Sequence, residues 1–152
     1  MLVKTKFFGE IDLGEDKIIT FERGIIGFEE CKRFTILFDS EKEERPAISW
    51  LQSLDEQALA LPIINPLIVK ADYNPVVEDE LLKHLGELTE ENLVIFLAMT
   101  VPNDLTKMTV NLKAPFIINA DTRKGAQLIV ENQDYEVRYH VYDVLNKKKG
   151  AD

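Results

Sequence analysis

The stretch TVNLKAPFIINADTRKGAQ, residues 109–127, decides the fold, because it combines strand-forming residues with residues that strands rarely tolerate. FIIN and the later AQLIV predict two strands joined by the turn ADTRKG. Pro115 cannot donate a ladder hydrogen bond and disfavours helical backbone at Ala114, so it fits a sheet edge or the start of FIIN. Asn111 and Asn119 can bond backbone groups that the proline or the turn leaves unpaired. The stretch predicts a hairpin with one fixed edge, shaped either to hold a protein partner or to close the barrel.

Short apolar segments separated by Gly, Asn, Asp and Pro continue this pattern along the chain. In YEVRYHV, residues 135–141, tyrosines and valines alternate with charged residues and a histidine, which predicts a strand with one buried face. LVIFLAMTV, residues 93–101, is apolar in both alternating sets and predicts a central strand covered on both sides. Further predicted strands are VKTKFF (3–8), KIITFE (17–22), FTILFDS (34–40), AISWLQS (47–53) and ALALPII (58–64).

One stretch, VVEDELLKHLGEL at residues 76–88, has helical spacing. Acidic residues come first, Leu81, Leu82 and Leu85 share one face, and Gly86 can end the helix. The expected fold class is therefore mainly β: a small single-domain antiparallel β-barrel-like fold with one or two short helices.

The length and composition indicate one globular domain. With 152 residues, 45% hydrophobic and 30% charged, the chain can bury a core. No linker or repeat divides residues 1–145, and NKKKGAD, residues 146–152, reads as a flexible basic tail. Cys31 is the only cysteine, which excludes an internal disulfide and suits the cytoplasm. No run resembles a signal-peptide core or a membrane-spanning segment.

The charge is strongly negative: 27 acidic against 18 basic residues give a formal net charge of −9. Such a surface repels phosphate backbones, so direct nucleic-acid binding is not expected. It can attract a basic protein partner, although solubility is the simpler explanation of the charge.

Residues suited to catalysis are few. His84 lies on the predicted helix and His140 on the polar face of a predicted strand, so a two-histidine metal site is not indicated. Cys31 lies between acidic and basic neighbours whose charges oppose one another, and a reactive thiol is not indicated. The adjacent pair Glu90 and Glu91, like the other glutamate pairs, reads as solvated loop charge rather than an acid–base pair.

The glycines of ERGIIGF, Gly24 and Gly27, predict a tight turn with Phe28 packing back on the barrel. A phosphate-binding loop would need a Lys-Ser or Lys-Thr pair and a following helix. The sequence predicts a small barrel whose loops contain turn-forming Gly, Pro, Asn and Asp residues, and it shows no recognisable catalytic group. This pattern favours a binding module over an enzyme. A barrel that takes an apolar small molecule in its interior or mouth stays open as the alternative.

Four stretches in this order resemble the flagellar assembly factor family, FliW. They are FERGIIGFEECKRFTIL, then WLQSLDEQALALPIINPLIV, then ADYNPVVEDELLKHLGEL with VIFLAMTVPNDLTKMTVNLKAPFIIN, and last RKGAQLIV. NLKAPFIIN followed by Gln127, eight residues after Asn119, is the most specific part. The similarity covers nearly the whole chain. Ile26 stands where the family often has proline, which predicts a less rigid loop.

The resemblance implies a β-barrel-like fold without enzymatic activity, cofactor or metal, and a monomer when free. It also implies two protein partners in the bacterial cytoplasm, flagellin and CsrA. CsrA is a homodimeric RNA-binding repressor of translation that restrains flagellin production. A family member binds CsrA away from, or only beside, its RNA face and releases the message, and cytoplasmic flagellin competes for the family member. Export of flagellin then permits more flagellin synthesis.

Flagellin is secreted through its ends, so the expected mode is a disordered terminal segment that folds on a groove or sheet edge. The predicted partner-binding residues lie in the glycine-flanked loop, before the helix, after the central strand and in the NLKAP motif. For each, a turn or packing role stays open as well. They are Phe28, Asp72, Tyr73, Asn74, Val101, Pro102, Asn103, Asp104, Asn111, Leu112, Lys113, Ala114 and Pro115.

Overall fold

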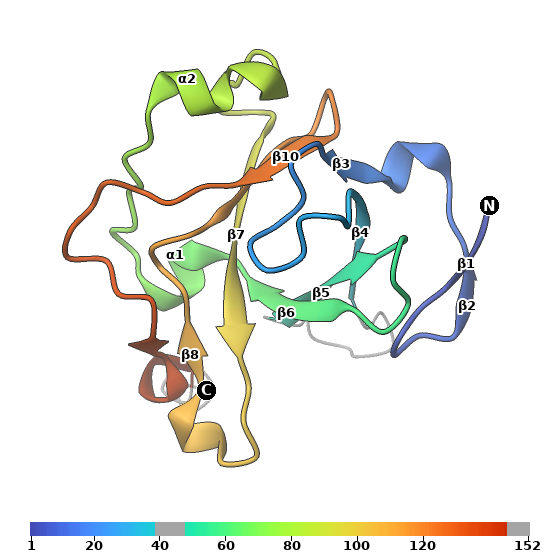
Figure 1. The fold of residues 1–152 in the computed structure, drawn as a ribbon. Helices are drawn as coiled ribbons and strands as arrows, with labels where there is room; N and C mark the ends of the chain where they lie inside the picture. Colours follow the sequence, from blue (N-terminus) through green and yellow to red (C-terminus); the bar gives the residue numbers. More distant parts are fainter. Residues whose placement is uncertain (39–47, 146–152) are drawn as a thin grey trace.

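A closed ring of seven strands forms the centre of the molecule (Figure 1). The structure, a computed structural model, describes residues 1–38 and 48–145, so the predicted tail at 146–152 lies outside the described residues. The predicted mainly β, barrel-like fold is confirmed. Around the ring, with β9 pairing again with β7, the strands are β7 (Leu93–Thr100), β6 (Ala60–Ile64), β5 (Ile48–Ser53), β4 (Arg33–Leu37), β3 (Ile19–Phe21), β10 (Lys124–Gln127) and β9 (Phe116–Asn119).

One pair in the ring departs from the predicted antiparallel arrangement. β3 and β10 run parallel, with Thr20 opposite Lys124 and Phe21 opposite Gly125. The other ring pairs are antiparallel. Parallel neighbours need a long connection, and here most of the chain lies between the two strands.

Aromatic and branched aliphatic side chains fill the ring. The ring of Phe21 meets Phe34 at 5.4 Å and Phe116 at 6.1 Å between centroids, both edge to face. This is a favoured aromatic geometry. We call this cluster the barrel core, and its other buried members are Ile19, Ile25, Leu51, Leu59, Ile63 and Ile118.

β7 is covered on both faces, as its sequence predicted. Val94, Phe96 and Ala98 pack against the barrel core, whereas Leu97 and Met99 belong to a second buried cluster on the other side. A strand shared by two cores needs apolar side chains in both alternating sets.

The second cluster, the flank core, lies outside the ring. β8 (Thr109–Val110) pairs with the end of β7, and β11 (Tyr139–His140) pairs with β8. The short helix α1 (Pro66–Val69) begins at Asn65, whose Oδ1 accepts from the N–H of Leu67 at 3.0 Å. The buried members of the flank core are Ile64, Val69, Tyr73, Leu97, Met99, Met108, Val110, Leu112, Val130, Tyr135 and Val141.

The strand predicted at residues 135–141 is wrong over most of its length. Only its Tyr139 and His140 are in β11. Val137 is 57% exposed although it was expected on the buried face. The carbonyl of Glu136 accepts from the N–H of Leu112 at 2.9 Å, so this segment crosses the flank core as a loop.

The helix predicted at residues 76–88 is shorter than expected. α2 (Asp79–Leu82) continues into the single 3-10 turn η2 (Lys83–Leu85), and Gly86 ends it at φ +87°, as predicted. Val76 stays outside the helix because its N–H donates to Asn132 Oδ1 at 2.7 Å and its carbonyl accepts from the N–H of Glu131 at 2.8 Å.

A small separate sheet of β1 (Leu2–Lys4) and β2 (Glu10–Asp12) precedes the ring. The strand predicted at 3–8 ends early because Thr5 closes a turn, in which its Oγ1 donates to the Gly9 carbonyl at 2.7 Å. Two further elements are the single 3-10 turns η1 (Glu15–Lys17) and η3 (Leu105–Lys107), and residues 142–145 at the end of the described chain are helical. Across the two described ranges, the helices are too short and too polar to cross a bilayer.

Candidate functional site

The NLKAP bulge, residues 111–115, interrupts the pairing of the preceding and following strands with β7. Before it, Val110 lies opposite Met99; after it, Phe116 lies opposite Phe96. Five residues, 111–115, therefore lie opposite two, 97 and 98, so three extra residues leave the ladder. Extra residues of this kind bend a strand and redirect side chains.

Asn111 closes the bulge with its side chain. Its Oδ1 accepts from the N–H groups of Lys113 at 2.9 Å and Ala114 at 3.1 Å, which confirms that it bonds unpaired backbone groups. Pro115 lies directly before β9, and its carbonyl accepts from the N–H of Leu128 at 3.2 Å. β9 lies between β7 and β10, so the segment is not a free sheet edge; Pro115 instead takes the other predicted position, at the start of FIIN, and the segment closes the barrel.

Two stacked tyrosines connect the bulge to the segment before α2. The rings of Tyr73 and Tyr135 are 4.9 Å apart and inclined by 18°. The Tyr73 hydroxyl donates to the Leu112 carbonyl at 2.8 Å, and the Tyr135 hydroxyl accepts from the N–H of Asn74 at 2.7 Å. Burial raises the pKa of Tyr73, so this hydroxyl remains a donor.

Asn132 completes this network, although no sequence signal beyond its place in a turn-like cluster pointed to it. Its side chain accepts from the N–H of Val76 at 2.7 Å and donates to the Asn74 carbonyl at 3.0 Å. Its own carbonyl accepts from Lys113 Nζ at 2.6 Å. Asn132 thereby fixes its own segment against residues 74–76 and against the NLKAP bulge.

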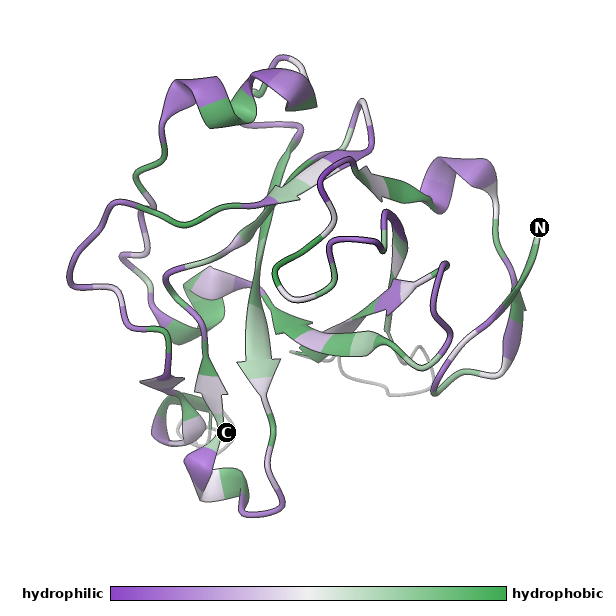
Figure 2. Cartoon of the chain, viewed as in Figure 1, coloured by the Kyte–Doolittle hydropathy of each residue, from purple (hydrophilic) through white to green (hydrophobic). Residues whose placement is uncertain are grey.

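The 24–28 loop presents an apolar tip. The N–H of Phe28 donates to the carbonyl of Ile25 at 2.9 Å, which closes a tight hairpin. Ile25, rather than the predicted Phe28, packs into the barrel core, where it is 2% exposed. Ile26 and Phe28 are 53% and 44% exposed. Figure 2 shows apolar residues in this loop, in front of β7.

The tight turn predicted from the two glycines of this loop is confirmed. Gly24 has φ +67° and Gly27 has φ +88°. A Cβ on Gly24 would lie 2.4 Å from the carbonyl oxygen of Glu29, so a side chain does not fit there.

Residues 101–104 lie in a different place. They follow β7 at the end of the molecule opposite α2 (Figure 1). Val101 is 42% exposed. Asp104 begins η3, and its Oδ1 accepts from the N–H of Thr106 at 3.1 Å and from the Thr106 hydroxyl at 2.6 Å.

Asp72 lies on the surface beside the tyrosine pair. Its carboxylate is 3.0 Å from Lys70 Nζ, which in turn lies 5.7 Å from the centre of the Tyr135 ring. The hydrogen bond from Lys70 holds the pKa of Asp72 below its usual value. Because the Asp72 side chain is exposed, this ion pair adds little stability.

The predicted residues therefore divide by location. Tyr73 bonds the NLKAP bulge directly, and Asn74 is linked to it through Asn132. The side chain of Gln127 links the 24–28 loop to the same bulge, and residues 101–104 lie apart. Tyr73, Leu112, Ala114 and Pro115 are buried, whereas Pro102, Asn111 and Lys113 are half-buried. The exposed members are Phe28, Asp72, Asn74, Val101, Asn103 and Asp104.

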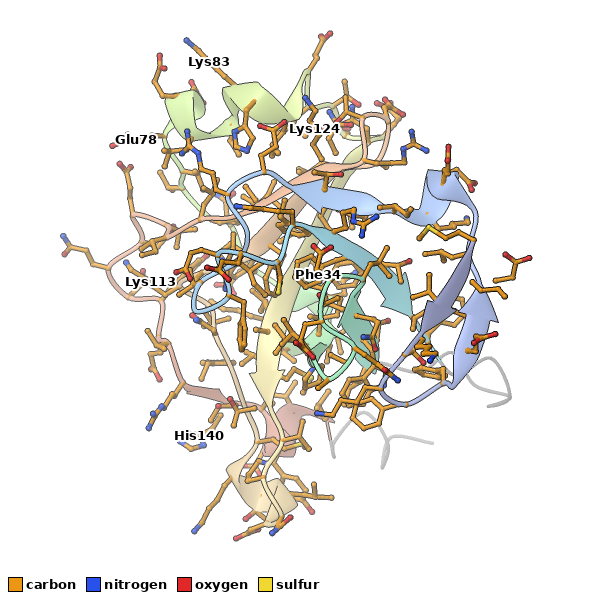
Figure 3. The ribbon with its side chains drawn as sticks, turned by 45° about the vertical axis from the view of Figure 1, so that its right-hand side comes forward. Phe34, Glu78, Lys83, Lys113, Lys124 and His140 are labelled. Atoms are coloured by element: carbon orange, nitrogen blue, oxygen red, sulfur yellow. The ribbon has the colours of Figure 1, made fainter. Side chains whose placement is uncertain are left out.

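Groups that could perform chemistry do not converge. His84 follows Lys83 at the α2 end, whereas His140 lies at the opposite end (Figure 3). Within residues 1–38 and 48–145, no three potential metal-ligating side chains come together. Two open hollows of about 290 and 210 Å³ lie at the surface beside Arg123, and the barrel-core residues Ile19 and Ile118 line part of the second.

Comparison with known proteins identifies relatives along the whole chain. The FliW protein family matches residues 2–141. The flagellar assembly factor FliW of Lachnoclostridium phytofermentans is 60% identical over 153 residues, which cover 100% of this chain and 98% of that protein. The FliW of Lachnospira eligens is 56% identical over 98% of this chain and 99% of that protein. The FliW of Thermotoga maritima is 39% identical over 98% of each.

The fold agrees with these relatives. A crystal structure of a flagellar assembly factor FliW is similar at a TM-score of 0.83 and 31% sequence identity, and the match covers 93% of this chain and 96% of that chain. Sequence and fold thus give the same relationship over nearly the full length. The chain belongs to the FliW family of flagellar assembly factors.

Proposed function

We propose that this chain is a non-enzymatic regulator of flagellar assembly in the bacterial cytoplasm, which binds the translational repressor CsrA and relieves repression of flagellin synthesis. Cytoplasmic flagellin competes for the chain, and its export frees the chain to act on CsrA again. The observation that carries the proposal is membership of a family whose members are named flagellar assembly factors.

Exposed apolar side chains on well-held loops support protein binding. Phe28 and Val101 are 44% and 42% exposed, and both stand next to turns with defined hydrogen bonds. Such side chains can act as anchors in a partner's pocket. We expect Phe28 and Val101 to contact a partner, whereas buried Tyr73, Leu112 and Ala114 act by fixing the shape of the surface.

Calorimetry with purified CsrA and purified flagellin, singly and in competition, tests the proposal. We expect the chain to bind each protein and flagellin to reduce the apparent affinity for CsrA. Absence of binding to both proteins would overturn the proposed function.

Matched variants test the surface. Phe28→Ala and Val101→Ala are each expected to weaken binding of at least one partner about tenfold or more, the loss typical of an anchor residue. Leu2→Ala on β1 is the control, because Leu2 is 69% exposed but belongs to no predicted contact. Equal affinities in all three variants would remove these positions from the proposed interface.

An acidic face around α2 supports an electrostatic contribution to RNA release. Lys83 offsets part of this charge, and its Nζ pairs with Glu80 at 2.8 Å. Figure 2 shows polar residues along α2. Docked on an RNA-binding dimer, such a face adds negative potential near the phosphates and weakens RNA binding. The acidic residues are Glu78, Asp79, Glu80, Glu87, Glu90 and Glu91, all exposed.

The paired substitution Glu90→Lys with Glu91→Lys tests this contribution. We expect docking on CsrA to change little, while displacement of labelled RNA from CsrA becomes less complete in a fluorescence titration. Glu90→Gln with Glu91→Gln should lie between the reversed pair and the unchanged chain. Displacement that is the same in all three proteins would contradict the electrostatic part of the proposal.

A further inference from the structure

Gln127 connects the exposed 24–28 tip to the buried NLKAP bulge with one side chain. Its Oε1 accepts from the N–H of Ile26 at 2.8 Å, and its Nε2 donates to the Ala114 carbonyl at 3.1 Å. A side-chain amide carries an acceptor and donors on one plane, so glutamine can make both bonds at once. This is the glutamine that forms part of the most specific sequence motif.

The two ends of the link differ in how firmly they are held. Ala114 is 4% exposed, and its N–H is bound by Asn111 Oδ1. The tip lies on the surface and is closed only on its own loop by the bond from the Phe28 N–H to the Ile25 carbonyl, so Gln127 is the side chain that joins it to the bulge. The two hydrogen bonds of Gln127 therefore fix the position of the tip relative to the bulge.

The tip belongs to a larger apolar surface. Ile129 is 64% exposed and follows Gln127 by two positions. The N–H groups of Leu128 and Val130 bond the carbonyls of Pro115 and Lys113, so this segment is paired along the bulge. Side chains alternate in such a segment, which places Ile129 on the same face as Gln127.

Carboxylates border this apolar surface. Glu29 and Glu30 follow the tip directly and Glu131 follows the Ile129 segment, all three exposed. They outnumber the cations of the same border, which are the exposed Arg23 before the tip and the half-buried Lys32 after it. An apolar centre with a negative rim fits an apolar peptide segment flanked by lysine or arginine. We assign this apolar surface to flagellin, whose disordered end segment is the expected occupant of an exposed groove or sheet edge.

We infer that Gln127 is a positioning residue that holds Ile26 and Phe28 in the geometry that receives the flagellin segment. The inference rests on the proposed function. A preorganised loop loses less conformational freedom on binding than a free one, so the link raises affinity without touching the partner.

A double-substitution cycle on the full chain tests the inference, with calorimetry against purified flagellin. We expect Gln127→Leu and Phe28→Ala each to weaken binding about tenfold. The double variant should lose less affinity than the sum of the two single losses, because Gln127 acts through the tip that Phe28 belongs to. Gln133→Leu, at an exposed glutamine, is the control and should bind like the unchanged chain.

Amide hydrogen exchange provides a readout that does not need the partner. Gln127→Leu should raise the exchange rate of the Ile26 amide, whereas Gln127→Glu keeps the acceptor and should leave that rate low. At neutral pH the glutamate cannot donate to the Ala114 carbonyl, so its flagellin affinity should still fall several-fold, by about the value of one hydrogen bond. Full affinity in Gln127→Glu would contradict the role of the Ala114 bond.

The outcomes separate this inference from the proposed function. If Phe28→Ala weakens flagellin binding and Gln127→Leu does not, positioning by Gln127 is overturned and the proposed function stands. An additive loss in the double variant also overturns it, because Gln127 would then act independently of the tip. If CsrA rather than flagellin loses affinity in both single variants, the assigned partner is wrong. If the unchanged chain binds neither protein, both proposals fail.

Discussion

The barrel core and the flank core are stabilised in different ways. In the barrel core, nine buried apolar side chains pack on one another, with Phe21 edge to face on Phe34 and Phe116, and the polar side chains that the ring strands also bury, such as Gln52 and Asn119, are not part of this cluster. In the flank core, polar groups complete the packing: Tyr73 and Tyr135 both use their hydroxyl groups in hydrogen bonds to backbone. Asn111 and Asn132 beside them do the same with their amides.

This difference assigns the two regions different tasks. Apolar burial is non-directional and stabilises the barrel as a whole, whereas hydrogen bonds fix the shape of particular loops. The predicted partner-binding residues lie in the flank core, on its loops or on the loop over the barrel end, and none is a member of the barrel core. The barrel is the scaffold, and the loops around it carry the predicted partner-binding residues.

Truncating a barrel phenylalanine should have the largest effect. Phe116→Ala removes a ring that is 1% exposed and leaves a cavity beside Phe21, so the free energy of unfolding should fall by about 3–5 kcal/mol. Urea denaturation measures this loss. Phe28→Ala, at an exposed ring, is the control and should lower the free energy of unfolding by less than about 1 kcal/mol. Similar losses at both positions would break the distinction between scaffold and surface.

Asn119 tests whether a polar side chain within the ring matters as much. It is fully buried, donates to the carbonyls of Leu85 and Glu87, and accepts from the N–H groups of Asp121 and Thr122. Asn119→Ala should cost about 2–3 kcal/mol, because buried groups lose their partners. Differential scanning calorimetry measures the change. A loss below about 0.5 kcal/mol would show that water replaces these bonds.

The strands of the barrel were largely predictable, because buried strand positions carry apolar side chains and these positions follow a regular pattern in the sequence. β7 is apolar in both alternating sets and is covered on both faces. The parallel pairing of Thr20 with Lys124 was not predictable, since it joins distant segments and depends on closure of the ring. The three extra residues of the NLKAP bulge also follow from pairing geometry rather than from residue pattern.

The flank was less predictable because hydrogen bonds there override periodicity. Residues 135–141 alternate like a strand, yet Tyr135 stacks on Tyr73 and the following residues form a loop. Val76 has helical spacing with its neighbours but is held outside α2 by Asn132. Period-two and helical patterns report burial of side chains, and they carry little information about which backbone groups a distant side chain will bond.

Tyr73→Phe tests the flank without opening a cavity. It removes one hydrogen bond to the Leu112 carbonyl, so the free energy of unfolding should fall by about 1 kcal/mol. The larger change should be local, as faster amide exchange at Lys113 within the bulge, while amides of β4 and β5 exchange as before. Equal acceleration in β4 and β5 would mean that the flank and the barrel open together.

The smallest expected effect is a pH dependence of the free energy of unfolding that comes from Asp55, which contacts Arg33 in the barrel strand β4. Burial raises the pKa of Asp55, but hydrogen bonds from the N–H groups of Arg33 and Lys32 and from the Arg33 side chain outweigh it and lower the pKa overall. A carboxyl whose pKa is lower in the folded state stabilises the fold above its unfolded pKa of about 4 and loses that contribution as the pH falls below it. The free energy of unfolding should therefore decrease with acidification in this window, and less so in Asp55→Asn. Parallel pH profiles for the two proteins would show that this contact adds nothing to the barrel beyond its apolar core.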